Sequence, residues 1–257
     1  CKVNRLSIGL QSANDGERRI LGRRADKSEV QSVVSRAKKV GINNISLDVM
    51  LGVPGQTKES LKSTLDFCIS SGVPHLSCYI LKIEENTPFF RMRDKLPFPS
   101  DDDTADMYLF MCEYLEEHGI MQYEISNFAV PGFESRHNLK YWHDEEYLGI
   151  GASAHSFLGG KRTYYPRDIE YFISGNERLT EGDGGDEEEF CMLALRLREG
   201  LTQERFYARF HHEIPQKMLE SAKQYEKYGL CRCESGGISL TRRGFLLSNS
   251  VISEIIL

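Results

Sequence analysis

The first eighty residues alternate between two hydrophobic periods. Short apolar runs with many β-branched residues lie at residues 3–9, 44–51 and 75–81, a pattern typical of buried strands. Between them, residues 28–40 and 57–72 carry apolar side chains every three or four positions, which predicts two amphipathic helices. The order strand, helix, strand, helix, strand predicts three parallel strands joined by helical crossovers.

Both helices carry capping signals at their ends. Ser28 and Gln31 form a candidate capping box at the start of the first helix, and Gly41 follows its last apolar position. Thr57 is the expected N-cap of the second helix, and Gly72 is expected to end it. We therefore expect the first helix to begin at Ser28 and the second directly after Thr57.

The middle of the chain contains one further clear helix. Residues 100–119 place apolar side chains on one side of a helix, and residues 123–129 predict another strand. Residues 130–165 are rich in aromatic residues, glycine and histidine and show no regular period. The acidic, glycine-containing run EGDGGDEEE at 181–189 is typical of a linker, so we expect a domain boundary at its start.

The predicted boundary divides the chain into residues 1–180 and residues 181–257. In the second part, residues 188–198 and 203–228 have helical periods, and a small hairpin and a last helix follow. This order predicts a small, mostly helical, winged-helix-like module. The first part holds the parallel strands, so the predicted fold class is α/β.

Composition narrows the class of protein. The 257 residues include 32 Lys and Arg against 38 Asp and Glu, a net charge of −6, so nucleic acid is not an expected partner. No apolar run approaches the roughly 18 residues that a membrane helix needs. The first residues have neither the basic start nor the apolar stretch of a signal peptide. Seven scattered cysteines do not form a disulfide framework, which favours a reducing, cytoplasmic setting.

Motifs for common cofactors are incomplete in this sequence. The cysteines offer no short, repeated spacing on which a zinc ion or an iron–sulfur cluster could form, so we expect buried structural thiols. Residues 52–58 (GVPGQTK) lie between a strand and a helix, as a phosphate loop does, but lack the P-loop spacing. Residues 149–154 (GIGASA) match the dinucleotide fingerprint, yet Gly159 and Gly160 interrupt the helix that should follow.

Polar residues near the ends of the predicted parallel strands form a first candidate site. Gln11 follows the first strand, and Asp48 lies inside the otherwise apolar second strand. Arg23 lies on the loop after a short helix that begins near the end of the first strand. Ligands of parallel sheets bind at the carboxyl ends of the strands. A ligand site and a buried Asp48–Arg23 ion pair without function explain these charges equally well.

Residues 136–157 form the densest cluster of chemistry-bearing side chains. The run contains three histidines, two tyrosines and the only tryptophan: His137, His143, His155, Tyr141, Tyr147 and Trp142. Imidazole and aromatic rings together suit a flat aromatic ligand or a metal-bearing macrocycle. A loop whose rings fill a domain interface explains the same composition.

Eight runs of the chain recur in the same order in a known family. They are VNRLSIGLQS (3–12), LGRRAD (21–26), SLDVMLGVPGQT (46–57), HLSCYIL (75–81), RHNLKYW (136–142), YLGIGASAHSF (147–157), LRLREGL (195–201) and SLTRRGFLLSN (239–249). Together they resemble the radical S-adenosylmethionine (radical SAM) proteins related to oxygen-independent coproporphyrinogen III oxidase. HNLKYW followed by GIGASAHS is more similar to the haem chaperone branch of that family. The resemblance extends over essentially the whole chain.

The resemblance implies a fold, cofactors and site residues. The implied fold is the second half of a partial (β/α)₆ radical SAM barrel, followed by the C-terminal module. Family members bind S-adenosylmethionine and hold a [4Fe–4S] cluster on a C-x-x-x-C-x-x-C loop, which this sequence lacks. By position, Gln11, Arg23 and Asp48 correspond to S-adenosylmethionine contacts. His137 corresponds to a haem-iron ligand, and Tyr141 to its neighbour in the haem site.

The resemblance also implies partners. We expect haem or a porphyrinogen as the ligand, proteins that accept haem as partners, and no radical chemistry from the chain as given. A chain that begins inside a parallel sheet should expose the edge of its first strand and self-associate there. Two other classes remain open, a winged-helix DNA-binding regulator and a phosphate-binding (β/α) barrel enzyme.

Overall fold

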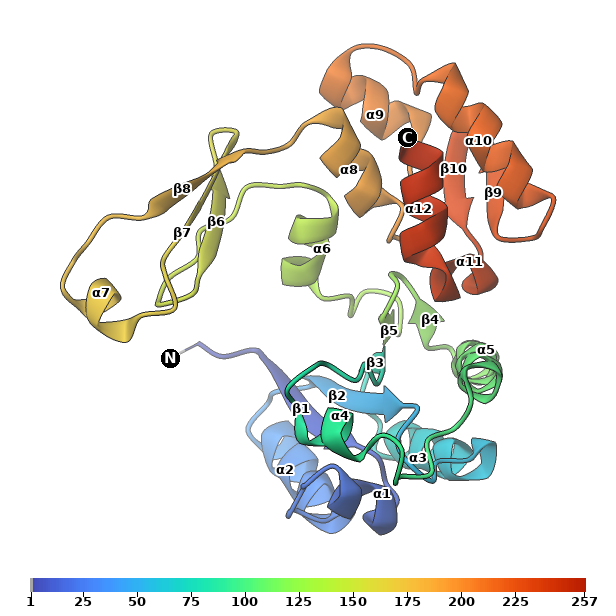
Figure 1. Ribbon diagram of the computed structural model, residues 1–257. Helices are drawn as coiled ribbons and strands as arrows, with labels where there is room; N and C mark the ends of the chain where they lie inside the picture. The colour runs from blue at the N-terminus through green and yellow to red at the C-terminus, as the bar shows by residue number, and fades with distance from the viewer. Residues whose placement is uncertain (1) are drawn as a thin grey trace. The chain divides into compact units, whose positions relative to one another are not determined.

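The computed structural model describes residues 2–257, and its contacts divide the chain into two units after Glu134 (Figure 1). The first unit contains β1 (Arg5–Gln11), α1 (Asp15–Ile20), α2 (Lys27–Lys39), β2 (Asn44–Leu51), α3 (Lys58–Ser70), β3 (His75–Ile80), α4 (Pro88–Met92), α5 (Asp101–Glu117), β4 (Met121–Gln122) and β5 (Asn127–Ala129). The second contains α6 (Arg136–Trp142), β6 (His155–Leu158), β7 (Lys161–Tyr164), α7 (Ile169–Ile173), β8 (Leu179–Asp183), α8 (Glu187–Ala194), α9 (Gln203–Phe210), α10 (Gln216–Glu226), β9 (Cys231–Glu234), β10 (Gly237–Leu240), α11 (Arg242–Leu246) and α12 (Ser248–Ile256). None of the helices within residues 2–257 has both the length and the apolar character needed to cross a membrane.

One mixed sheet organises the first unit. Its strand order is β1-β2-β3-β5-β4; the first three strands are parallel, as predicted, and β5 runs antiparallel to both β3 and β4. The α/β class is therefore confirmed. The single strand expected at 123–129 is wrong, because a turn separates β4 from β5 and the Glu124 carboxylate accepts a hydrogen bond from the Ser126 amide at 3.1 Å.

The helix boundaries follow the predicted caps with one correction. Thr57 caps α3 as expected, while α2 begins one residue before Ser28 and is capped by Asp26. The Asp26 carboxylate accepts hydrogen bonds from the backbone amides of Ser28 and Glu29, and the Glu29 carboxylate accepts one from the Asp26 amide. A carboxylate accepts these bonds more strongly than a serine hydroxyl does, so the capping box starts at Asp26.

The two faces of the sheet have different chemistry. Leu47, Val49 and Leu76 are fully buried and face the side on which α2, α3 and α5 supply their own buried apolar residues. On the opposite face, register places Gly9 beside Asp48, Asp48 beside Ser77, and Ser77 beside Asn127. These four residues form one row across four strands, which we call the polar row.

A hydrogen-bonded chain runs next to the polar row. The fully buried His75 ring contacts the Ser46 hydroxyl through Nδ1 at 2.7 Å and the Tyr123 hydroxyl through Nε2 at 2.8 Å. The Ser46 hydroxyl lies 3.3 Å from that of Ser77. Burial lowers the pKa of His75 to about 3, because the cationic ring would lose its hydration. His75 is therefore neutral in the folded chain.

The second unit begins earlier than the sequence predicts. Residues 135–180 group with the C-terminal part, so the division lies at 134/135 and not at 180/181. The acidic run 181–189 is not a free linker: Leu179–Asp183 is β8, which pairs with β7, and Asp186 caps α8. The helix expected over 203–228 is two helices, because His211 adopts a left-handed conformation (φ 62°) and Pro215 follows.

We predict that His75 makes folding stability depend on pH. Its folded pKa of about 3 lies below the ordinary histidine value, so the unfolded chain binds more protons between these values. The contribution of His75 to the free energy of unfolding is complete above about pH 6.5. It is lost as the pH falls toward 3, by at most about 1.4 kcal/mol per pH unit. Urea unfolding of the wild type and His75→Gln across this range measures the difference in slope.

The exposed His118 supplies the control for this measurement. His118→Gln removes a histidine that lies at the end of α5 and should keep the wild-type slope. An equal slope in His75→Gln and in the wild type would contradict the buried neutral histidine.

Candidate functional site

The structure brings Gln11, Arg23 and Asp48 together around Gly9. Asp48 pairs with Gly9 across β1 and β2, and Gln11 lies at an irregularity where β1 takes a left-handed residue (φ 68°). A Cβ atom placed on Gly9 would lie 2.9 Å from the Gln11 amide nitrogen and 3.9 Å from an Arg23 guanidinium nitrogen. The missing side chain of Gly9 therefore leaves a space that the Gln11 and Arg23 side chains reach, and Asp48 is the register partner of Gly9 on β2.

A buried arginine positions the loop that carries Arg23. The Arg18 guanidinium donates hydrogen bonds to the carbonyl oxygens of Leu10 at 2.6 Å, Ser12 at 3.1 Å and Ala25 at 2.9 Å. The Arg23 amide in turn donates to the Arg18 carbonyl oxygen at 2.9 Å. Arg18 thus connects the carboxyl end of β1 to both ends of the loop.

The buried ion pair considered as an alternative does not form. Arg23 is exposed, and within residues 2–257 no ion pair joins it to Asp48. The Asp48 carboxylate instead accepts a hydrogen bond from the Ser7 hydroxyl at 3.0 Å. The cluster therefore presents a carboxylate and an amide suited to hydroxyl groups, and a guanidinium suited to a carboxylate.

The loop at residues 52–57 does not provide a phosphate cradle. The amide of Gly52 donates to the Gln56 side chain at 2.8 Å, and the amide of Gly55 donates to the Pro97 carbonyl at 2.7 Å. The Thr57 amide donates to the Ser60 hydroxyl at 3.0 Å. Backbone N–H groups that are already used cannot bind a phosphate, so the phosphate-enzyme alternative loses its structural basis.

The cysteines do not fit an iron–sulfur cluster. Cys68, Cys78 and Cys112 are buried in the core of the first unit, and burial raises the pKa of the Cys68 and Cys78 thiols. A cluster needs thiolates, and these thiols stay protonated. Among residues 2–257 no three Cys, His, Asp or Glu side chains converge as metal ligands. Five of the six described cysteines are buried thiols, as predicted; Cys233 is half-buried, and Cys1 lies outside the described residues.

In the second unit, His137 and Tyr141 lie one turn apart on α6. The Tyr141 hydroxyl lies 3.0 Å from Nε2 of His137, and the two rings meet edge to face at 5.1 Å between centroids. Tyr147 extends the aromatic surface, with its ring 4.5 Å from that of Tyr141. Both His137 and Tyr141 are exposed, so the pair faces solvent in the described unit.

The other two histidines of this segment have carboxylate neighbours. His143 lies 3.7 Å from Glu145 and 3.5 Å from Glu199. His155 lies 3.1 Å from Glu181 through Nδ1 and stacks on Tyr164. His137 differs from both, because its recorded polar partner is a phenol.

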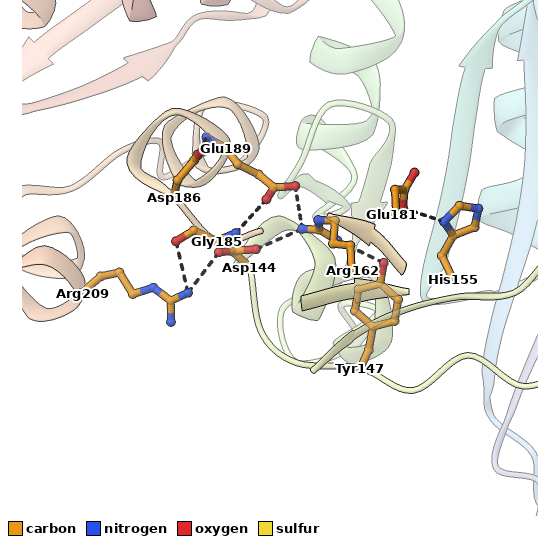
Figure 2. A network of polar contacts seen from close by, with 9 residues as sticks. All are labelled: Asp144, Tyr147, His155, Arg162, Glu181, Gly185, Asp186, Glu189 and Arg209. Carbon is orange, nitrogen blue, oxygen red and sulfur yellow. Dashed lines mark hydrogen bonds and ion pairs between the residues drawn. The ribbon is translucent and has the colours of Figure 1, made fainter. Parts of the chain in front are cut away.

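A buried carboxylate organises the segment between α6 and α8 (Figure 2). Only 1% of the Asp144 side chain is exposed, and its two oxygens pair with Arg162 and Arg209, each at 3.3 Å. Arg162 also pairs with Glu189 at 2.6 Å, and Glu189 accepts a hydrogen bond from the Gly185 amide at 2.8 Å. Burial raises the pKa of Asp144, and the two guanidinium groups oppose that rise.

The first glycine of GIGASA, Gly149, serves packing, and β6 rather than a helix follows the motif. A Cβ atom on Gly149 would lie 2.1 Å from the carbonyl oxygen of His155, and the Gly149 amide donates to the Ser156 hydroxyl at 3.0 Å. Strand β6 follows at His155, where a dinucleotide site needs a helix.

Several residues that shape these sites carry no signal in the sequence pattern. Arg18 lies on a short polar helix, where an arginine is ordinarily solvated, and its burial depends on the Leu10 and Ser12 carbonyls at the end of β1. Arg162 lies in a strand with no regular period. Asp144 adopts a left-handed conformation (φ 52°). Aspartate adopts this conformation more readily than most residues, and this tendency was the one local signal in the sequence.

Two protein-family models match the two ends of the chain. Residues 1–68 match the model of the radical SAM superfamily, and residues 187–247 match that of the HemN C-terminal domain. A solved structure of coproporphyrinogen III oxidase (HemN) from Escherichia coli, a radical SAM enzyme, superposes with a TM-score of 0.79 at 20% identity. The alignment covers 99% of this chain and 64% of that one, and it shows the shared fold.

Curated relatives match over almost the whole chain. The heme chaperone HemW of Bacillus subtilis is 35% identical over 99% of this chain and 70% of its own length, and that of Lactococcus lactis is 34% identical over 99% and 69%. The mitochondrial radical S-adenosyl methionine domain-containing protein 1 of Danio rerio is 32% identical over 99% of this chain and 62% of its own length. The chain belongs to the HemW family of radical SAM proteins.

Proposed function

We propose that this chain acts as a haem chaperone and binds haem on α6, with His137 as the iron ligand. The relatives named haem chaperone HemW support the ligand class. The observation that carries the residue assignment is the pairing of His137 with Tyr141. Donation of an Nε2 hydrogen to the Tyr141 oxygen leaves Nδ1 unprotonated, and an unprotonated imidazole nitrogen is what iron binds.

The surroundings of His137 supply the other parts of a haem site. The rings of Tyr141 and Tyr147 provide a wall for the macrocycle. Arg136 and Lys140 provide cations for the propionates. The Lys140 ammonium also forms an ion pair with the Glu145 carboxylate at 2.7 Å. Trp142 is held by the Arg196 guanidinium 5.9 Å from its ring centre, which fixes the last turn of α6.

Haemin titration of single variants tests this assignment. We expect His137→Ala to weaken haemin binding at least tenfold and to remove the Soret shift of the histidine-bound form, because the ligand is gone. Tyr141→Phe keeps the ring wall and should weaken binding less, since it removes only the bond that orients the imidazole.

His143→Ala and His155→Ala are the matched controls for the haem experiment. Both histidines have carboxylate partners, and both variants should bind haemin as the wild type does. A Soret shift that survives His137→Ala and disappears in either control would assign the iron ligand to that other histidine. A shift that is unchanged in all three variants would refute histidine ligation.

We also propose that the cluster around Gly9 binds S-adenosylmethionine. Asp48 and the Gln11 amide can hydrogen-bond the ribose hydroxyls, and Arg23 can pair with the methionine carboxylate. When bound with its cluster, this cofactor supplies a carbon radical in radical SAM proteins. The described cysteines do not fit that cluster, so the proposal here is limited to binding.

Calorimetry with S-adenosylmethionine tests the Gly9 cluster. We expect weak binding by the wild type and a roughly tenfold further loss in Asp48→Asn, because the neutral amide forms weaker hydrogen bonds to hydroxyls than a carboxylate does. Asp102→Asn on the exposed start of α5 is the control and should bind as the wild type does. Equal affinities of Asp48→Asn and the wild type would place the ligand elsewhere.

Partners and setting complete the proposal. We infer that proteins receiving haem are the partners of α6, on the strength of the chaperone relatives alone. The six described cysteines are free thiols, which supports a reducing, cytoplasmic setting. Neither DNA binding nor phosphate chemistry gains support from the family matches.

The edge of β1 is a further proposed contact surface. Strand β1 is at one end of the sheet, its Leu6 and Ile8 are half-exposed, and within residues 2–257 no strand pairs with its outer side. We expect sedimentation to show a mass that rises with concentration, and Ser7→Lys to shift it toward the monomer because edge lysines oppose strand pairing. A monomer at all concentrations would refute the proposal.

A further inference from the structure

Asn127 is the last residue of the polar row and has no role in the sites described above. Its register with Ser77 on β3 places it on the same face of the sheet as Asp48, two strands away. Neighbouring strands lie about 4.8 Å apart, so Asp48 and Asn127 are separated by roughly 10 Å along the row. Only 3% of Asn127 is exposed.

The side chain of Asn127 is unsatisfied in the described chain. Its Oδ1 atom is buried without a hydrogen-bond partner, and no hydrogen bond of its Nδ2 atom is recorded within residues 2–257. Buried polar groups in folded proteins are almost always hydrogen-bonded, and an unpaired one is destabilising.

The rest of the row is already paired, which isolates Asn127 as the open position. Ser77 contacts the Ser46 hydroxyl, and Asp48 accepts from Ser7. Tyr79, two residues beyond Ser77 on the same face, is 43% exposed and offers a ring against which a flat group can stack. An amide with a free donor and acceptor beside an exposed ring recognises a planar group through that group's edge.

We infer that Asn127 binds the N–H edge of a planar nitrogen heterocycle that lies along the polar row. This inference rests on the proposed ligand site at Gly9 for its starting point. Two sources have the required chemistry. An adenine base whose ribose is held at Asp48 would reach along the row toward Asn127, and its edge pairs with an asparagine amide through one donor and one acceptor. A metal-free tetrapyrrole presents pyrrole N–H donors to the amide oxygen.

Removal of the amide gives opposite results for a binding residue and for a structural one. Asn127→Leu keeps the branching and the number of side-chain heavy atoms and removes the unpaired polar atom, so we expect the free chain to keep or raise its melting temperature. If a trapped water or a protein group satisfied the amide, the same variant would lose stability, and the inference would be overturned. Asn43→Leu, at an exposed loop position before β2, is the matched control and should leave both stability and binding unchanged.

Binding measurements then identify the source. Adenosine and metal-free protoporphyrin IX are the two probes, and haemin, which has no pyrrole N–H, is the reference. We expect Asn127→Leu to lose roughly tenfold in affinity for one of the two probes and nothing for haemin. Loss for adenosine identifies the adenine base; loss for the free porphyrin identifies the tetrapyrrole.

The outcomes separate this inference from the proposed function. Asp48→Asn reports on the Gly9 cluster and His137→Ala on α6, whatever happens at Asn127. A wild-type chain that binds neither probe, or an Asn127→Leu chain that binds both as tightly as the wild type, overturns the inference at Asn127.

Discussion

The in-register pairing of β1, β2 and β3 is the constraint on which the first unit depends. Because side chains alternate between the faces of a strand, this register sends Leu47, Val49 and Leu76 to the helices and gathers Gly9, Asp48 and Ser77 on the other face. A slip of one residue on β2 would place Asp48 in the apolar core. The core and the polar row therefore fix the same register for independent reasons.

In the second unit α8 to α12 bury apolar residues as the first unit does, while charged groups join the β6–β7–β8 sheet to α8 and α9. Its β6–β7–β8 sheet is small, and the Asp144 carboxylate supplies what a larger core would otherwise supply: a buried point that ties β7, the start of α8 and the end of α9 together. Removing one partner of a buried ion pair costs about 3–5 kcal/mol, more than most single apolar contacts. The segment that carries His137 ends at this network, so the network limits how far α6 can move within its unit.

Much of the first unit could be predicted from the sequence, because its signals are local. The apolar runs of β1 to β3, the periodic faces of α2 and α3 and the cap at Thr57 all lie within short windows. Asp48 stood out as a charge in an apolar run, and its place beside Gly9, near the end of β1, follows from the parallel register. The reversal at β5 could not be predicted, since it depends on a four-residue connection, residues 123–126, with no glycine or proline.

The second unit was less predictable because its elements are held by distant contacts. Residues 130–165 have no period since their strands are four residues long and partly exposed. The acidic run at 181–189 has the composition of a linker, and only its pairing with β7 and the Glu189–Arg162 ion pair make it part of a folded unit. Arg162 escaped notice for the same reason, because Asp144 and Glu189 lie far from it in the chain. The partners of Arg18 are backbone carbonyls within eight residues of it, and backbone carbonyls leave no signal in the sequence.

Asp144 shows how narrowly two unrelated demands can restrict one position during evolution. Its backbone conformation (φ 52°) favours glycine, asparagine and aspartate, while the two guanidinium groups beside it demand a negative charge. Glutamate meets the second demand and not the first; asparagine and glycine meet the first and not the second. A lineage that replaced Asp144 would have to change Arg162 or Arg209 as well, so the three positions should drift together or not at all.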